Sequence, residues 1–320
     1  MDESRQGSVA DITANPKMAL DTLWDKGSEI IRASMIDPPS FVEPPHIYHY
    51  TTEMGLWGIL KSGKLWLTDI FSLNDPSELE HGLNLANEKL DKKAEEDPAK
   101  YREIVKGFRT LHIREDHNLP RFFVCSFSKS GDDLGQWRGY AADGRGYAIG
   151  FKTTCLKARF GKRKSETSDG GEFLVEYQDD KLADIYGRLI DLVLAEVSTI
   201  GQNDPDYCSD LRKLYFRLVL NASVYFKHEA YCNEQEYRFL NIEMAPQSHS
   251  ILKRVRNFEL IDYKQFDWRS AGTDVLKKIA IGPAADFEKS KRFAEDCLRE
   301  SSIDIASVEI SQSKIPYKPA

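Results

Sequence analysis

The sequence predicts an α+β fold with a central, mostly antiparallel or split β-sheet and several flanking helices. Segments with strand periodicity and segments with helix periodicity are mixed without a regular alternation of strand and helix, which favours this class. The chain has 320 residues, of which 41% are hydrophobic, 30% charged and 11% aromatic, as in an ordinary globular protein. No internal repeat, dinucleotide GxGxxG motif or phosphate loop is present.

The first 45 residues are predicted to form a polar tail and one helix. The helix is expected over 16–35, because Pro16 suits a first turn and Pro38-Pro39 follows its end. Residues 46–320 are predicted to form a single elaborated α+β domain with a helical insertion at about 179–230. Two long helices in this insertion are marked by apolar residues at helical spacing: Leu182, Ile185, Leu189, Leu192 and Val193 for the first, and Leu211, Leu214, Tyr215, Leu218, Ala222 and Tyr225 for the second.

The predicted strands are short segments rich in aromatic and β-branched residues. The clearest is 121–128, with the sequence RFFVCSFS. The other strands are expected at 46–51, 64–68, 146–152, 172–177, 236–242, 257–261, 277–281 and 305–310. Further helices are expected at 54–61, after the turn at 74–76, before residue 118, at 134–141 and after Gly282-Pro283.

Composition argues against several functional classes. The five cysteines form no CxxC pair and the seven histidines include no HExxH motif, so neither a disulfide framework nor a metal site is expected. The net charge of −7 gives no overall attraction to nucleic acid. The basic run at 157–164 is interpreted as a solvated loop or, alternatively, as a phosphate or nucleic-acid contact. Without a membrane-length apolar run or a secretion signal, the protein is expected in the cytoplasm and away from membranes.

The first polar motif is Tyr48-His49-Tyr50-Thr51. Because side chains alternate along a strand, His49 and Thr51 should point to one face and the two tyrosines to the other. An imidazole and a hydroxyl side by side can hydrogen-bond a sugar diol or an amide. The alternative is a core histidine that is satisfied by the backbone.

The second motif is Asn74-Asp75-Pro76 with Ser77 and Glu78. Asp75 before proline makes a good turn, and Asp75 or Ser77 can cap the next helix. In a functional interpretation, Asn74 and Asp75 shape the pocket floor or bind a ligand.

The third motif joins the strand end Cys125-Ser126-Phe127-Ser128 to the helix that carries Trp137 and Tyr140. Ser126 and Ser128 lie where α+β folds often place site groups. Trp137 and Tyr140 are three residues apart, so they share a helix surface and can stack on a planar ring, or simply contribute to the core. Cys125 is expected to be a buried structural thiol.

The fourth motif is Glu234-Gln235-Glu236-Tyr237-Arg238. In an extended segment Glu234, Glu236 and Arg238 share one face. Two nearby carboxylates compensated by an arginine suit a site that holds a ribose hydroxyl and stabilises positive charge at the anomeric carbon. A Glu–Arg ladder on the surface of a strand is the alternative.

Together and in this order, the four motifs resemble an uncharacterised bacterial family, the domain-of-unknown-function family 2971, over about residues 46–242. The order of histidine, hydroxyl and glutamate on early, middle and late strands is also similar to the ADP-ribosyltransferase superfamily. That resemblance implies an ADP-ribosyltransferase-like fold in which His49 binds a ribose hydroxyl of NAD. It also implies that Ser126 or Ser128 shapes the nicotinamide pocket, that Glu236 orients the nicotinamide ribose, and that Glu234 stands at the acceptor-selecting position.

The expected function is therefore an enzyme that cleaves the nicotinamide–ribose bond of NAD and passes ADP-ribose to a macromolecule or to water, as a toxin-like or phage-defence effector. Glu236, Glu234 and His49 are the expected catalytic residues. The expected ligand contacts come from the other motif residues, Tyr48, Thr51, Asn74, Asp75, Ser126, Ser128, Trp137, Tyr140 and Arg238, with Arg121, Arg138 or Arg238 at the pyrophosphate. The alternatives are a sensor module that binds a nucleotide or protein without catalysis and, ranked lower, a metal-dependent nuclease that uses Asp75, Glu78, Glu234 and Glu236.

Overall fold

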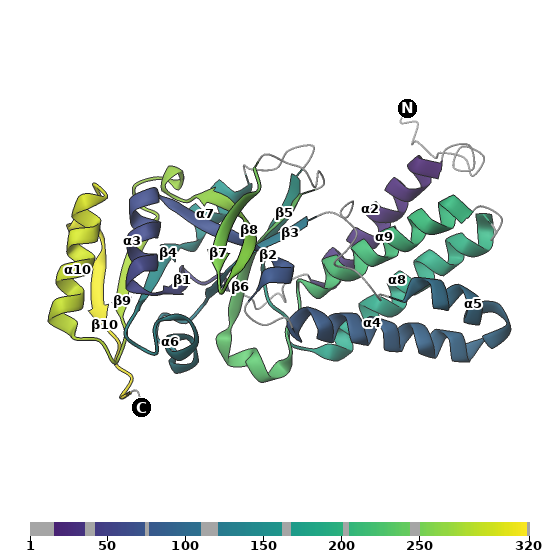
Figure 1. The fold of residues 1–320 in the computed structure, drawn as a ribbon, viewed down its shortest axis with the longest axis horizontal. Coiled ribbons are helices and arrows are strands. Elements are labelled where there is room, and N and C mark those ends of the chain that lie inside the picture. The colour runs from purple at the N-terminus through teal and green to yellow at the C-terminus, as the bar shows by residue number, and fades with distance from the viewer. Residues whose placement is uncertain are drawn as a thin grey trace. The chain divides into compact units, whose positions relative to one another are not determined.

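The computed structural model describes residues 16–35, 42–73, 77–109, 121–161, 168–200, 205–243 and 250–318. The chain divides into two compact units, drawn in Figure 1. The helical unit comprises residues 1–40, 75–119 and 176–229, and the sheet unit comprises residues 41–74, 120–175 and 230–320. The predicted N-terminal helix and the predicted helical insertion both belong to the helical unit.

The helical unit contains α2 (Pro16–Ser34), α4 (Ser77–Glu96), α5 (Pro98–Phe108), α8 (Asp179–Ile200) and α9 (Pro205–Ser223). Proline is the first residue of α2, α5 and α9, where its missing N–H leaves no helical hydrogen bond unmade. The apolar stripes of these helices meet in one core, which includes Ile31, Ala86, Leu189 and Leu218. Within that unit the buried hydroxyls of Tyr186 and Ser223 hydrogen-bond each other at 2.8 Å.

The sheet unit is built around a large, open and mostly antiparallel sheet, as predicted (Figure 1). Along the main path the order of its strands is β10-β9-β4-β1-β3-β2-β8-β7, and β6 pairs with both β3 and β5. Only the β9–β10 pair is parallel among the described strands. The strands are β1 (His46–Thr51), β2 (Lys64–Asp69), β3 (Arg121–Ser128), β4 (Tyr147–Lys152), β5 (Ser168–Leu174), β6 (Glu236–Glu243), β7 (Leu252–Arg256), β8 (Glu259–Asp267), β9 (Leu276–Ile281) and β10 (Glu309–Gln312).

Different helices pack against the two faces of this sheet. Helices α3 (Glu53–Ser62), α7 (Thr153–Gly161) and α10 (Phe287–Glu300) contribute to a large core on the face that carries Ile47, Phe127 and Ile149. On the other face Trp137 of the short helix α6 (Leu134–Tyr140) packs edge-on against Tyr50 at 4.8 Å. The predicted alternation of faces along β1 is therefore confirmed.

The sheet branches at β3, which decides where a site can form. One edge of β3 pairs with β6 along its whole length. Its other edge pairs with β1 at Ser128 and with β2 at Phe123 and Val124. Within the described chain, residues 125–127 pair with neither β1 nor β2. Strands β1 and β2 therefore diverge along this edge of β3, and helix α3 connects the end of β1 to the start of β2.

The chain around residue 257 differs from the prediction. Instead of one strand at 257–261, β7 and β8 form a hairpin whose turn residues Asn257 and Phe258 have φ angles of 49° and 66°. This left-handed pair is the geometry of a tight hairpin turn, which usually carries glycine. None of the helices in the described part of the chain is long and apolar enough to cross a lipid bilayer.

Candidate functional site

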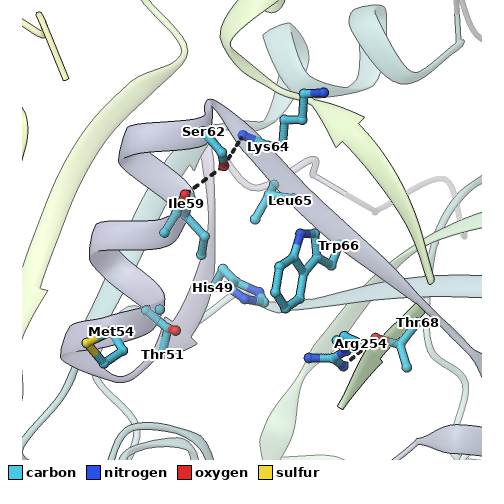
Figure 2. A pocket seen from close by; sticks show the side chains of 12 residues that line it. His49, Thr51, Met54, Ile59, Ser62, Lys64, Leu65, Trp66, Thr68 and Arg254 are labelled. Atoms are coloured by element: carbon cyan, nitrogen blue, oxygen red, sulfur yellow. Dashed lines mark hydrogen bonds between the residues drawn. The ribbon is translucent and has the colours of Figure 1, made fainter. Parts of the chain in front are cut away.

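A cavity of about 270 Å³ lies in the sheet unit beside the branch of the sheet (Figure 2). Strand β1 contributes His49 and Thr51, and helix α3 contributes Met54, Gly55, Gly58, Ile59 and Ser62. Strand β2 contributes Lys64, Leu65, Trp66 and Thr68, and β7 contributes Arg254. The two predicted ligand contacts on β1 that share a face, His49 and Thr51, therefore line the same cavity.

His49 is held in one tautomer by the backbone of β3. Its Nδ1 donates a hydrogen bond of 3.0 Å to the carbonyl oxygen of Ser126, in the stretch of β3 that lacks a strand partner on this edge. In the neutral ring this leaves Nε2 with a lone pair. Burial lowers the pKa of His49 below its usual 6.5, although the hydrogen bond to Ser126 opposes this shift. His49 is therefore neutral at pH 7 and can accept a hydrogen bond.

Helix α3 approaches β1 closely because it carries glycine where the two meet. A Cβ atom at Gly55 would lie 1.8 Å from Oγ1 of Thr51, whereas a Cβ atom at Gly58 would meet nothing within 4 Å. Thr52 caps the helix by accepting a hydrogen bond of 3.2 Å from the Gly55 amide. The helix ends at Gly63, whose φ of 66° suits glycine. The space at Gly58 is part of the cavity.

Trp66 and Arg254 form the wall of the cavity opposite α3, and sequence reasoning had assigned neither to a site. The indole of Trp66 is 44% exposed, and the Arg254 guanidinium lies 5.0 Å from its ring centre. Arg254 also donates a hydrogen bond of 3.1 Å to Thr68 Oγ1. One signal was present in the sequence. In the alternating strand KLWLT, Leu65 and Leu67 face the core, so an aromatic residue between them must face outward.

Several other predicted site residues gather on the opposite face of the sheet. Tyr48, Ser128 and Glu236 are register partners across β1, β3 and β6, and Ser126 is the partner of Arg238. Ser126 connects the two faces, because its carbonyl oxygen binds His49 while its exposed side chain lies on the face of Glu236.

Glu236 and Arg238 form a buried ion pair within β6. Arg238 Nε donates to Glu236 Oε1 at 2.6 Å and Nη2 donates to Oε2 at 3.0 Å. Only 3% and 6% of the two side chains are exposed. Arg238 therefore holds both oxygens of the predicted catalytic carboxylate.

Glu234 does not share the face of Glu236, contrary to the expectation for an extended segment. It ends a 3₁₀ helix, Glu229–Glu234, and Gln235 then takes a φ of 45° before β6 begins. Ser128 Oγ donates a hydrogen bond of 2.8 Å to the Glu234 carbonyl, which anchors this bend. The local turn thus changes the face on which Glu234 lies.

The remaining predicted residues lie elsewhere. Trp137 is fully buried and its Nε1 donates to Asp132 at 2.7 Å, while Tyr140 at the end of α6 is 38% exposed. Asn74 and Asp75 lie outside the described residues. Burial, and then the charge of Glu236, raise the pKa of the Cys125 thiol to about 12, so it is no nucleophile. Among the described residues no group of three histidine, cysteine, aspartate or glutamate side chains is placed to hold a metal ion.

Comparison with known proteins gives one match. A family model described as "Protein of unknown function (DUF2971)" matches residues 136–239, from α6 into β6. This stretch contains Trp137, Tyr140 and the Glu236–Arg238 pair, but not the cavity residues of β1, α3, β2 and β7. No curated protein and no solved structure matches the chain. Over about a third of its length, the chain is thus similar to a protein family of unknown function.

Proposed function

We propose that the protein binds NAD or a related nucleotide in the cavity between β1, α3 and β2, and that it cleaves the nicotinamide–ribose bond. The proposal is carried by the cavity beside the branch of the sheet at β3. Its lining combines a hydrogen-bond acceptor (His49), a hydroxyl (Thr51), an exposed indole (Trp66) and two cations (Lys64 and Arg254). A nucleotide offers the complementary groups, namely a sugar diol, a planar ring and phosphates. At about 270 Å³ the cavity is close to the lower end of known ligand sites, roughly 300–1,000 Å³, and so suits one mononucleotide half of NAD.

Each cavity residue has a distinct part in this proposal. His49 Nε2 accepts a hydrogen bond from a ribose hydroxyl, and Thr51 bonds the neighbouring hydroxyl. The exposed indole of Trp66 stacks on a planar ring of the ligand, the part that the sequence had suggested for Trp137 or Tyr140. Stacking suits Trp66 better because Trp137 is fully buried.

In the proposed reaction the bond between C1′ of the ribose and the pyridinium nitrogen breaks. Nicotinamide leaves as a neutral molecule with the bonding electron pair. An oxygen of the acceptor, either water or a macromolecule, bonds to C1′ and releases its proton to solvent. Glu236 lies on the opposite face of the sheet and does not line the cavity, so His49 and Thr51 are the polar groups proposed to face the positive charge that develops on the sugar.

The test is to incubate the full chain with NAD, with and without cell lysate as a source of acceptors, and to follow released nicotinamide. Release is expected to vanish in His49→Ala while the fold persists, because His49 lines the cavity and is proposed to hold the ribose. Gly58→Leu should abolish binding and release together, because the new side chain fills open space in the cavity. Glu309→Gln changes an exposed residue on β10 outside the cavity, so it serves as the control and should change nothing. Full activity of a folded His49→Ala protein would contradict the assignment.

A second candidate function is recognition of a nucleotide without turnover. The observation in its favour is the bidentate ion pair, which engages both oxygens of Glu236 in a buried position. NAD binding that depends on His49 and Trp66, with no nicotinamide released under any condition, would establish this function instead.

A further inference from the structure

The cavity has a positive wall that no acidic side chain balances. Its described lining includes Lys64 and Arg254 and no aspartate or glutamate. Lys64 Nζ donates to the neutral Gln265 Oε1 at 3.0 Å, and neither cation lies within 4.0 Å of a carboxylate among the described residues. Unpaired positive charge at a concave, partly buried site favours an anionic ligand.

Arg254 is held so that part of its guanidinium remains available. One side is fixed by the hydrogen bond from Nη2 to Thr68 and by the contact with the Trp66 ring. Its Nε–H is buried and has no hydrogen-bond partner in the described structure. Burial, and then the neighbouring charge of Arg256, lower the pKa of Arg254. The charge of Arg254 is thus poorly stabilised by the protein itself, and a bound anion would relieve this deficit.

Two of the three arginines that the sequence suggested for a pyrophosphate, Arg121 and Arg238, already have carboxylate partners. Arg121 binds Asp262 at 2.9 Å and also contacts Asp69. Arg238 is in the ion pair with Glu236. Arg254 is the arginine that lines the cavity.

We propose that Arg254 is the anion subsite of this cavity and binds a phosphate or pyrophosphate group of the ligand through its planar fork, oriented by Trp66 and Thr68. The subsite rests on the proposed function, because it belongs to the same cavity, and it assigns the ligand to the phosphorylated nucleotides rather than to free nucleosides. A planar guanidinium forms two parallel hydrogen bonds to phosphate, which an ammonium cannot reproduce.

The experiment is calorimetric titration of the full chain, at low ionic strength, with inorganic pyrophosphate and separately with NAD. Arg254→Gln is expected to weaken both affinities at least tenfold, and Arg254→Lys should restore little of the loss. Lys253→Gln is the matched control, because Lys253 is the preceding residue on β7, faces the other side of the strand and pairs with Asp262. It should leave both affinities within twofold of wild type.

A second measurement does not depend on the folding of a variant. Bound pyrophosphate should protect Arg254 of the wild-type chain from an arginine-directed dicarbonyl reagent, as followed by peptide mass spectrometry. Unchanged affinity in Arg254→Gln, an equal loss in Lys253→Gln, or no protection of Arg254 at saturating pyrophosphate would overturn the subsite.

The two proposals fail separately. If pyrophosphate binds through Arg254 but NAD neither binds nor competes, the anion subsite stands for other phosphates and the proposed function fails. If NAD is cleaved with no contribution from Arg254, the proposed function stands and the subsite is wrong.

Discussion

The imidazole ring of His49 has two roles: one nitrogen hydrogen-bonds the backbone of β3, and the ring also lines the cavity. Its Nδ1–H donates a hydrogen bond to the Ser126 carbonyl oxygen. Ser126 lies in the stretch of β3 that pairs with neither β1 nor β2. The hydrogen bond supplies this carbonyl with the donor that a strand partner would otherwise provide, and so stabilises the branch of the sheet. The same bond fixes the tautomer that presents Nε2 as an acceptor.

The lowered pKa of His49 predicts how stability depends on pH. The unfolded histidine takes up a proton near pH 6.5, whereas the folded one does so only at lower pH. The stabilisation is therefore complete above about pH 6.5 and is lost as the pH falls from there toward the folded pKa. Urea unfolding between about pH 5 and pH 7.5 should show a shallower pH slope for His49→Gln than for wild type.

His46 also has a pKa lowered by burial, with Lys278 as the next cause, so part of the slope will remain in His49→Gln. The His46→Gln variant measures that part. Identical slopes for wild type and His49→Gln would show that His49 does not titrate differently in the two states.

Phe258 is a second residue whose backbone geometry predicts a measurable effect. It has a φ of 66°, in the left-handed region that is unfavourable for a bulky residue, and its side chain is fully exposed. Within the described structure, burial of the ring therefore does not offset the unfavourable backbone conformation. Phe258→Gly is expected to raise the free energy of unfolding by about 1 kcal/mol. Asn257→Gly should raise it less, since asparagine tolerates this region. A loss of stability in Phe258→Gly would mean that the ring makes contacts that stabilise the fold.

At the scale of elements, the sequence pattern was sufficient to predict a strand where the residues of that strand alone showed the typical strand composition. The predicted bounds of β1 and β3, 46–51 and 121–128, agree with the structure, because both segments are rich in aromatic and β-branched residues. The β7–β8 hairpin escaped prediction because its turn is Asn-Phe rather than Asn-Gly. The assignment of segments to the two compact units depends on which distant segments pack together, so no local pattern indicates it.

Only some of the cavity residues could be predicted from the sequence, because the others come together only through the pairing of distant strands. His49 and Thr51 stood in a recognisable motif on one strand. Arg254 comes from an edge strand more than 200 residues later. Only the pairing of β2 with β8 and of β8 with β7 brings it beside Trp66. Neither residue has a local signal for ligand binding, so their proximity is a property of the tertiary fold.

The two glycines of α3 give a matched test of how this helix meets β1. Gly55→Ala should destabilise the protein, because the new methyl group would overlap Thr51 Oγ1. Gly58→Ala should stabilise it by roughly 0.5–1 kcal/mol, because its methyl group meets open space and alanine favours the helix. Chemical denaturation of both variants measures the difference. The double variant Gly55→Ala with Thr51→Ala should recover much of the loss, and no recovery would place the clash elsewhere.

At the scale of the whole molecule, the large core of each compact unit is built from segments that are far apart in the sequence. The chain passes between the units at residues 40/41, 74/75, 119/120, 175/176 and 229/230, so neither unit is one continuous piece of sequence. The sheet core joins strands and helices from both ends of the sheet unit, for example Phe127 of β3 and Leu298 of α10. Contacts between segments so distant in sequence should form cooperatively rather than one segment at a time.

The cysteines of the sheet unit can test that cooperativity. Cys125 on β3 and Cys297 on α10 are buried in the same core, and burial raises their thiol pKa values to about 12 and about 11. Both should resist alkylation near pH 8 in the native protein, whereas the exposed Cys232 should react at once. With increasing urea, Cys125 and Cys297 should become reactive at the same midpoint, because exposing either one requires the shared core to open. Peptide mass spectrometry after brief alkylation resolves the three sites in one experiment. If Cys297 reacted at a clearly lower urea concentration than Cys125, α10 would open independently of the sheet, and the core would consist of two cooperative parts instead of one.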